Sequence, residues 1–102
     1  HGLSGIKKIT GLPPEHQPKI LDYSLIDDII AVEDEEALDE GIRLARAEGI
    51  MVGPTTGALL HAARVTGESA DGLAVVISPD DATKYISTYI RHLESGRGQF
   101  SI

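Results

Sequence analysis

Cysteine and tryptophan are missing from this 102-residue chain, and its aromatic residues are limited to three Tyr and one Phe. Without cysteine, a disulfide scaffold, a thiolate zinc site and a cysteine nucleophile are excluded. The four histidines show no metal-ligand spacing, so we expect no metal. No apolar run approaches the roughly 20 residues that span a bilayer, and no secretory signal is visible. We therefore expect a cytoplasmic protein that has no membrane partner.

Basic residues are also scarce, with 9 Lys and Arg against 16 Asp and Glu, for a net charge of −7. No basic patch is available to neutralise phosphates, so we expect no nucleic-acid partner. Nine of the sixteen acidic residues fall within residues 27–48. We interpret most of them as the solvated face of one helix.

The organisation of the chain follows from its glycines, prolines and apolar runs. With 41% hydrophobic residues the composition is globular, and the length allows one domain at most. Residues 1–23, punctuated by Pro13-Pro14, predict an extended arm. Residues 24–94 predict an α/β segment, and residues 95–102 predict a flexible tail.

Hydrophobic periodicity predicts alternating strands and helices between residues 28 and 93. Asp34 is suited to cap a helix that Gly49 ends, and a second helix follows from Ala58 to Val65. A third helix carries Tyr85 and Tyr89 on its apolar core face. The short β-branched or apolar runs between the helices predict strands at 28–32, 50–52 and 73–77. The order βαβαβα predicts a three-layer α/β fold with parallel strands.

Two turns carry polar groups at the expected strand ends. Gly53-Pro54-Thr55-Thr56-Gly57 places two hydroxyls at a helix start, where free N–H groups also lie. Pro79-Asp80-Asp81 follows the last strand. Because ligands bind outside the carboxyl ends of parallel strands, we expect both turns to line one crevice if their strands are neighbours.

Five motifs occur in one order with familiar spacings. They are Leu25–Ile30, Asp34–Ala37, Glu48–Ala58, Ala74–Asp80 and Lys84–Thr88. Together they resemble the C-terminal third of the cysteine synthase and cystathionine β-synthase family. The resemblance implies that the chain is part of the larger fold-type II pyridoxal-phosphate enzyme fold.

The resemblance implies roles for particular residues at a cofactor site. Thr55 matches the hydroxyl residue that binds the pyridine nitrogen of pyridoxal phosphate, with Thr in place of the usual Ser. A neutral hydroxyl keeps the ring a weaker electron sink than a carboxylate would, which favours β-elimination through an aminoacrylate. The remaining implied cofactor contacts are Gly53, Thr56, Gly57, Pro79 and Asp80. The start of the arm 1–23 resembles the family's segment at the active-site mouth, which implies substrate contacts by Gly5 and Ile6.

The implied activity is β-replacement on serine or an O-activated serine by a sulfur nucleophile, in cysteine biosynthesis. The substrate is then a small amino acid and the enzyme a homodimer. The family's Schiff-base lysine has no match here, because Lys7, Lys8, Lys19 and Lys84 stand in other contexts. We therefore expect the C-terminal portion of a longer enzyme, inactive alone.

Two other classes of function remain open from the residues alone. Asp80 and Asp81 at a strand end suit a receiver-like regulatory module that binds a divalent cation. A non-catalytic interaction domain that kept an enzyme's fold is the other alternative. Cation binding that is lost in Asp80→Ala would favour the receiver-like module, whereas a lysine-bearing segment upstream of His1 would favour the enzyme.

Overall fold

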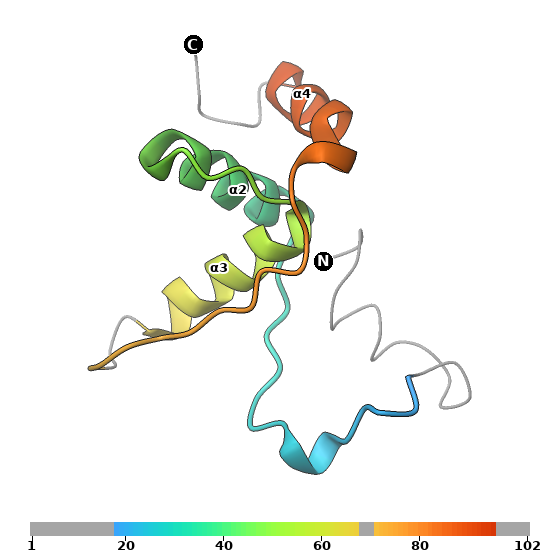
Figure 1. Ribbon diagram of the computed structural model, residues 1–102, viewed down its shortest axis with the longest axis vertical. Coiled ribbons are helices and arrows are strands. Elements are labelled where there is room, and N and C mark those ends of the chain that lie inside the picture. The colour runs from blue at the N-terminus through green and yellow to red at the C-terminus, as the bar shows by residue number, and fades with distance from the viewer. Residues whose placement is uncertain (1–17, 68–70, 96–102) are drawn as a thin grey trace.

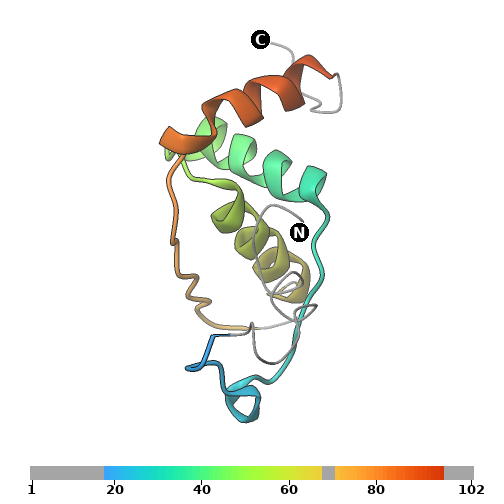
Figure 2. The same ribbon diagram turned by 90° about the vertical axis from the view of Figure 1, so that its right-hand side faces the viewer.

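The computed structural model describes residues 18–67 and 71–95, and within these ranges the regular elements are helical. They are the 3₁₀ turn η2 (Tyr23–Leu25), α2 (Asp34–Glu48), α3 (Pro54–Gly67), the 3₁₀ turn η3 (Thr83–Tyr85) and α4 (Ile86–Glu94). Helix α2 lies in the middle, packed mainly against α3 and also against α4 (Figures 1 and 2).

Helix α2 has strong local signals at both ends. The backbone N–H of Glu33 donates to the Glu36 carboxylate at 3.1 Å, which is one half of a capping box. Three acidic residues occupy the first turn, where the helix dipole favours negative charge. Gly49 ends the helix in the left-handed region with φ 72°. The N-cap is therefore Glu33, one residue before the Asp34 that the sequence predicted.

Helix α3 begins four residues earlier than the sequence predicted. It starts at Pro54, whose fixed φ suits the first helical position, where no N–H is needed. The N–H of Gly57 donates to the carbonyl of Gly53 at 3.1 Å. The Gly-Pro-Thr-Thr-Gly turn is thus the first turn of the helix itself.

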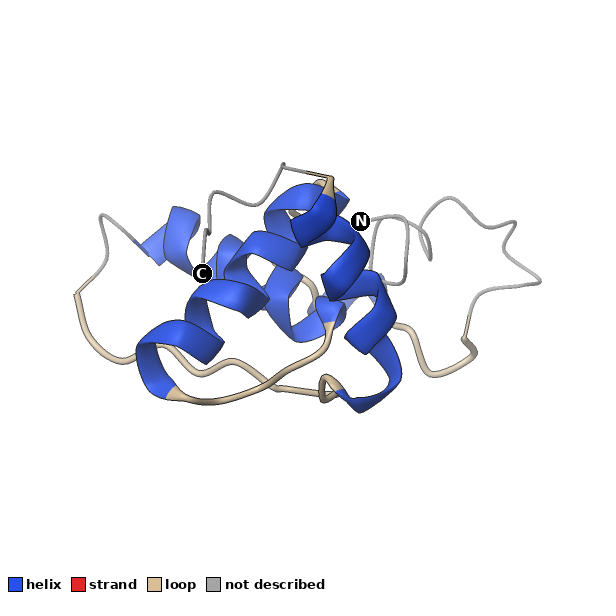
Figure 3. Ribbon diagram, turned by 90° about the horizontal axis from the view of Figure 1, so that it is seen from above, coloured by secondary structure: helices blue, strands red, loops and turns tan. Residues whose placement is uncertain are grey.

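The predicted parallel sheet is wrong for the residues that the structure describes. Residues 28–32, 50–52 and 73–77 form no strands there, and Figure 3 accordingly shows helices joined by loops. Among the described residues, Val52 at the end of the second run forms an isolated antiparallel bridge with Asp81, which lies beyond the third run. The α/β fold class is therefore overturned by a helical structure.

The physical reason is that β propensity acts through neighbours. A strand is stabilised by pairing its backbone and by packing against adjacent strands, and these three runs are not brought side by side. The side chain of Leu73 is 94% exposed and that of Ile77 is 75% exposed. The run 73–77 therefore lacks the burial on both faces that is typical of a strand in a parallel sheet covered by helices.

The core is small and lies between α2 and α3. It consists of Val32, Ala37 and Ala58, with Ile30 and Ala62 packed against it. Close approach of the two helices requires Gly57, because a Cβ there would overlap the carbonyl oxygen of Ala37. Within the described ranges, no helix has the length and apolar character needed to cross a membrane.

Contacts between polar side chains tie α2 to its two neighbours. Glu40 of α2 is buried and accepts a hydrogen bond from Nε of Arg64 on α3 at 2.7 Å. His61 of α3 lies 2.8 Å from the Glu36 carboxylate. On the other side, Nε2 of the buried His92 on α4 lies 2.7 Å from Oδ1 of Asp39. These contacts fix the helices on which the candidate site is built.

Candidate functional site at the start of helix α3

The two polar turns that the sequence singled out lie together in the structure. The backbone N–H of Gly53 donates to the carbonyl of Asp80 at 3.3 Å, next to the bridge between Val52 and Asp81. These contacts hold the start of α3 against the segment that precedes η3. The neighbourhood arises from this short antiparallel contact, in place of the parallel strand order from which it was inferred.

The carboxylate of Asp80 closes the N-terminus of α3. Its Oδ2 accepts from the N–H of Thr55 at 3.0 Å, and its Oδ1 accepts from the N–H of Thr56 at 2.9 Å. Oδ1 also accepts from the hydroxyl of Thr56 at 2.6 Å. Free N–H groups at a helix start are ordinarily satisfied by a cap residue just before the helix. Here the cap comes from a residue that follows the helix in the chain.

The two threonines of the turn occupy different environments. Thr56 is 2% exposed, and its hydroxyl also lies 2.9 Å from the hydroxyl of Ser78. Thr55 is only partly buried. Thr56 therefore holds the turn together from inside, and Thr55 is the threonine that a ligand at the surface of the turn would reach.

Of the other predicted site residues, the structure describes Gly53, Gly57 and Pro79. A Cβ on Gly53 would overlap the Asp80 carboxylate, so this glycine admits the cap, while Gly57 admits α2. Pro79 is exposed beside the turn. Gly5 and Ile6, the predicted substrate contacts, lie outside the described residues, as do most of the predicted arm and tail.

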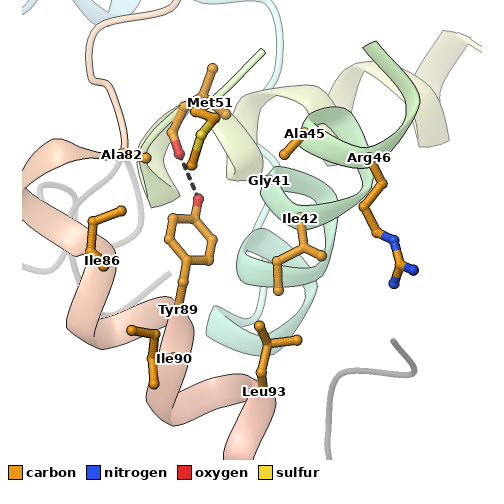
Figure 4. Close-up of a pocket in the computed structure, with 11 residues that line it drawn as sticks. Gly41, Ile42, Ala45, Arg46, Met51, Ala82, Ile86, Tyr89, Ile90 and Leu93 are labelled. Carbon is orange, nitrogen blue, oxygen red and sulfur yellow. Dashed lines mark hydrogen bonds between the residues drawn. The ribbon is translucent and has the colours of Figure 1, made fainter. Parts of the chain in front are cut away.

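Tyr89 supports the turn from α4, and the sequence indicated it only as a core residue. Its hydroxyl donates to the carbonyl of Val52 at 2.8 Å (Figure 4). Burial, assisted by the negative charge of Asp80, raises the pKa of Tyr89 to about 12. Tyr89 lines an apolar cavity of about 250 Å³ between α2 and α4, together with Ile86, Ile90 and Leu93. No local signal distinguishes this hydroxyl from that of Tyr85.

The acidic pair has no arrangement typical of a cation site. Asp81 accepts from the N–H of Thr83 at 2.8 Å, and this hydrogen bond lowers the pKa of the Asp81 carboxyl. Asp80 is committed to α3, as described above. Among the residues that the structure describes, no group of three or more His, Asp or Glu side chains is placed to hold a metal ion.

Comparison with known proteins identifies cysteine synthases among the relatives of this chain. A probable cysteine synthase of Bacillus subtilis is 39% identical over 89 residues, covering 85% of this chain and 29% of that protein. A cysteine synthase of Haemophilus influenzae is 40% identical over 87 residues, covering 82% and 28%. An O-ureido-L-serine synthase of Streptomyces lavendulae is 36% identical over 85 residues, covering 81% and 26%. No protein-family model matches the chain.

The resemblance predicted from the sequence is confirmed by these relatives. The chain is similar to cysteine synthases over more than four-fifths of its length, and it spans less than a third of the length of the relatives that it matches.

Proposed function

Because this chain is related to the cysteine synthases over most of its length, we propose that it supplies one wall of a pyridoxal-phosphate site in a longer enzyme. In this proposal the Thr55 hydroxyl faces the pyridine nitrogen of the cofactor. The enzyme replaces the β-substituent of serine or an O-activated serine with a sulfur nucleophile. A small amino-acid substrate, a homodimeric assembly and a cytoplasmic location belong to the same proposal.

The observation that carries the proposal is the difference between the two threonines. The hydroxyl of Thr56 is buried and bonded to Asp80, whereas Thr55 is partly exposed at the same helix start. A ring nitrogen needs one hydrogen-bonding group at its edge, and a threonine hydroxyl fits that need, since it donates or accepts. The residues of this turn therefore fit the nitrogen edge of the cofactor.

The same turn does not fit the phosphate of the cofactor. Helix starts bind phosphate through free N–H groups, but the Thr55 and Thr56 N–H groups already donate to Asp80. In this proposal, residues outside this turn bind the phosphate, provide the Schiff-base lysine and bind the substrate carboxylate.

The chemistry divides between the cofactor and the chain. When bound, pyridoxal phosphate withdraws electrons from the α-carbon of an amino acid, which permits loss of the β-substituent. Thr55 orients the ring and, as a neutral hydroxyl, places no negative charge at the nitrogen. Gly53, which has no side chain, allows a close approach to the backbone of the turn. The ring of Pro54 keeps that backbone rigid. The turn acts by binding and orienting the cofactor ring.

Substitution of Thr55 in the full-length protein tests the proposal. Thr55→Ser keeps the hydroxyl and should retain cofactor binding and sulfur-dependent consumption of O-acetylserine. Thr55→Val removes it and should weaken cofactor affinity roughly tenfold, as expected for one hydrogen bond in a site. Binding is followed by the visible absorbance of the cofactor, and turnover by thiol formation.

A matched control is available on the same helix. The hydroxyl of Thr66 donates to the carbonyl of Ala62 at 2.8 Å, at the exposed end of α3. Thr66→Val makes the same chemical change far from the turn and should leave cofactor affinity unchanged. Wild-type protein that binds no pyridoxal phosphate, or a Thr55→Val variant that binds it as tightly as wild type, would refute the proposal.

A further inference from the structure

Both oxygens of the Asp80 carboxylate are bonded to the helix start. Three donors reach it, namely the N–H groups of Thr55 and Thr56 and the Thr56 hydroxyl. Each of its two oxygens accepts at least one hydrogen bond. These hydrogen bonds hold the carboxylate against the first turn of α3.

Asp80 is also fixed from its backbone side. Its carbonyl accepts from the N–H of Gly53 at 3.3 Å, and Asp81 is bridged to Val52. The carbonyl of Val52 in turn accepts a hydrogen bond from the Tyr89 hydroxyl. The turn that carries Thr55 is thus held by the Asp80 side chain, by its own backbone hydrogen bond and by the hydrogen bond from Tyr89 of α4.

A carboxylate beside the turn suggests two roles that have opposite consequences. As a direct partner of the ring nitrogen, Asp80 would hold a proton there and make the ring a strong electron sink. As a cap of α3, it would set the direction in which Thr55 points and leave the ring nitrogen to a neutral group. The hydrogen bonds favour the second role, because the oxygens that a ring nitrogen would need are the ones that accept from Thr55 and Thr56.

We infer that Asp80 is a positioning residue for Thr55, which clamps the first turn of α3 and makes no contact with the cofactor. This inference rests on the proposed function, which it deepens by assigning the neutral hydroxyl, and no carboxylate, to the ring nitrogen.

A double-mutant cycle in the full-length protein tests the inference. Cofactor affinity is measured for wild type, Thr55→Val, Asp80→Ala and the double variant. We expect Asp80→Ala to weaken binding roughly tenfold and to abolish most of the further loss caused by Thr55→Val, because an unclamped Thr55 no longer reaches the ring. General destabilisation by Asp80→Ala would leave the full Thr55→Val loss in place, and that additive outcome would overturn the inference.

The pH profile of the bound cofactor separates the two roles of the carboxylate. A carboxylate paired with the ring nitrogen controls its protonation, so Asp80→Asn would then shift the pH dependence of the absorption band. We expect Asp80→Asn to leave that pH dependence unchanged, and a clear shift would overturn the inference. Asp81→Asn is the matched control, because it removes the same charge at the neighbouring residue. The Asp81 carboxylate accepts from the N–H of Thr83.

Hydrogen exchange judges the clamp without reference to the cofactor. The amides of Thr55 and Thr56 should exchange faster in Asp80→Ala than in wild type. Their exchange rates in Asp81→Asn should equal those in wild type. Wild-type protein that fails to bind pyridoxal phosphate would refute the proposed function and the cofactor role of Asp80, and faster exchange would then still establish the clamp. Unchanged exchange at Thr55 and Thr56 would overturn the clamp even if the cofactor binds.

Discussion

The close approach of α2 and α3 predicts a large penalty for one added methyl group. A Cβ at Gly57 would overlap the carbonyl oxygen of Ala37 and lie 3.0 Å from its carbonyl carbon and 3.3 Å from the N of Gly41. All three are backbone atoms, so no flexible side chain can move aside. The two helices must separate, which opens the small core of Val32, Ala37 and Ala58.

The magnitude follows from two opposing effects. Overpacking of this kind costs about 3 kcal/mol at the upper end of its usual range. Replacing glycine by alanine inside a helix returns about 1 kcal/mol through helix propensity. We expect Gly57→Ala to lower the free energy of unfolding by about 2 kcal/mol, or roughly thirtyfold in the unfolding equilibrium.

Gly67→Ala provides the matched control, because it makes the same substitution at the last residue of the same helix. A Cβ at Gly67 meets no atom within 4 Å, so its stability should be equal to wild type or slightly higher. Urea unfolding of the chain, followed by far-ultraviolet circular dichroism, measures both. With a slope of about 1 kcal/mol per molar urea, the Gly57→Ala midpoint should fall by about 2 M. Coinciding midpoints for the two variants would refute the packing that we describe.

Three further predictions concern α4 and the charged pairs. Tyr89→Phe should lower the free energy of unfolding by about 1 kcal/mol, because the Val52 carbonyl loses its donor; thermal unfolding measures it, and stability equal to wild type would contradict the bond. Because the pKa of Tyr89 is raised from 10.0 to about 12, its contribution to stability should be complete below pH 10 and disappear as pH rises through 12; tyrosinate absorbance should show one late-titrating group, and its absence would count against the burial of Tyr89. Arg64→Met should lower the free energy of unfolding by about 1 kcal/mol, and Arg43→Met should lower it less. The reason is that the guanidinium of Arg64 donates to Glu40 at 2.7 Å, while that of Arg43 lies 3.7 Å from Glu40. Equal chemical-denaturation midpoints for the two variants would contradict this ranking.

The parts of the fold that sequence predicted well are those with local causes. Helix α2 was predicted to within one residue, because acidic first-turn residues and Gly49 act on the helix ends directly. Helix α3 was predicted to start late, since Pro54 and two threonines are also typical of a turn. The strands were wrong because a run such as 73–77 becomes a strand only when neighbours pair with it, and pairing is not a property of the run itself.

The candidate site was predictable as a neighbourhood and not as a set of contacts. Thr55, Thr56 and Asp80 were selected from the sequence, and the structure brings them together. The direction of the Asp80 carboxylate could not be predicted, because a cap that lies 24 residues from the threonine whose N–H it accepts leaves no spacing signal. The bond from Tyr89 to Val52 spans 37 residues and was missed for the same reason.

The remote cap on α3 also has a consequence for the order in which the chain folds. Helices α2 and α3 are consecutive and pack together, so their contact closes a short loop and forms early. The bond from Thr56 to Asp80 closes a loop of 24 residues, which costs about 3 kcal/mol of chain entropy. It should therefore form only after α3 exists as a template. Because doubling such a loop adds only about 0.6 kcal/mol, insertions between α3 and Asp80 should weaken the cap only slightly.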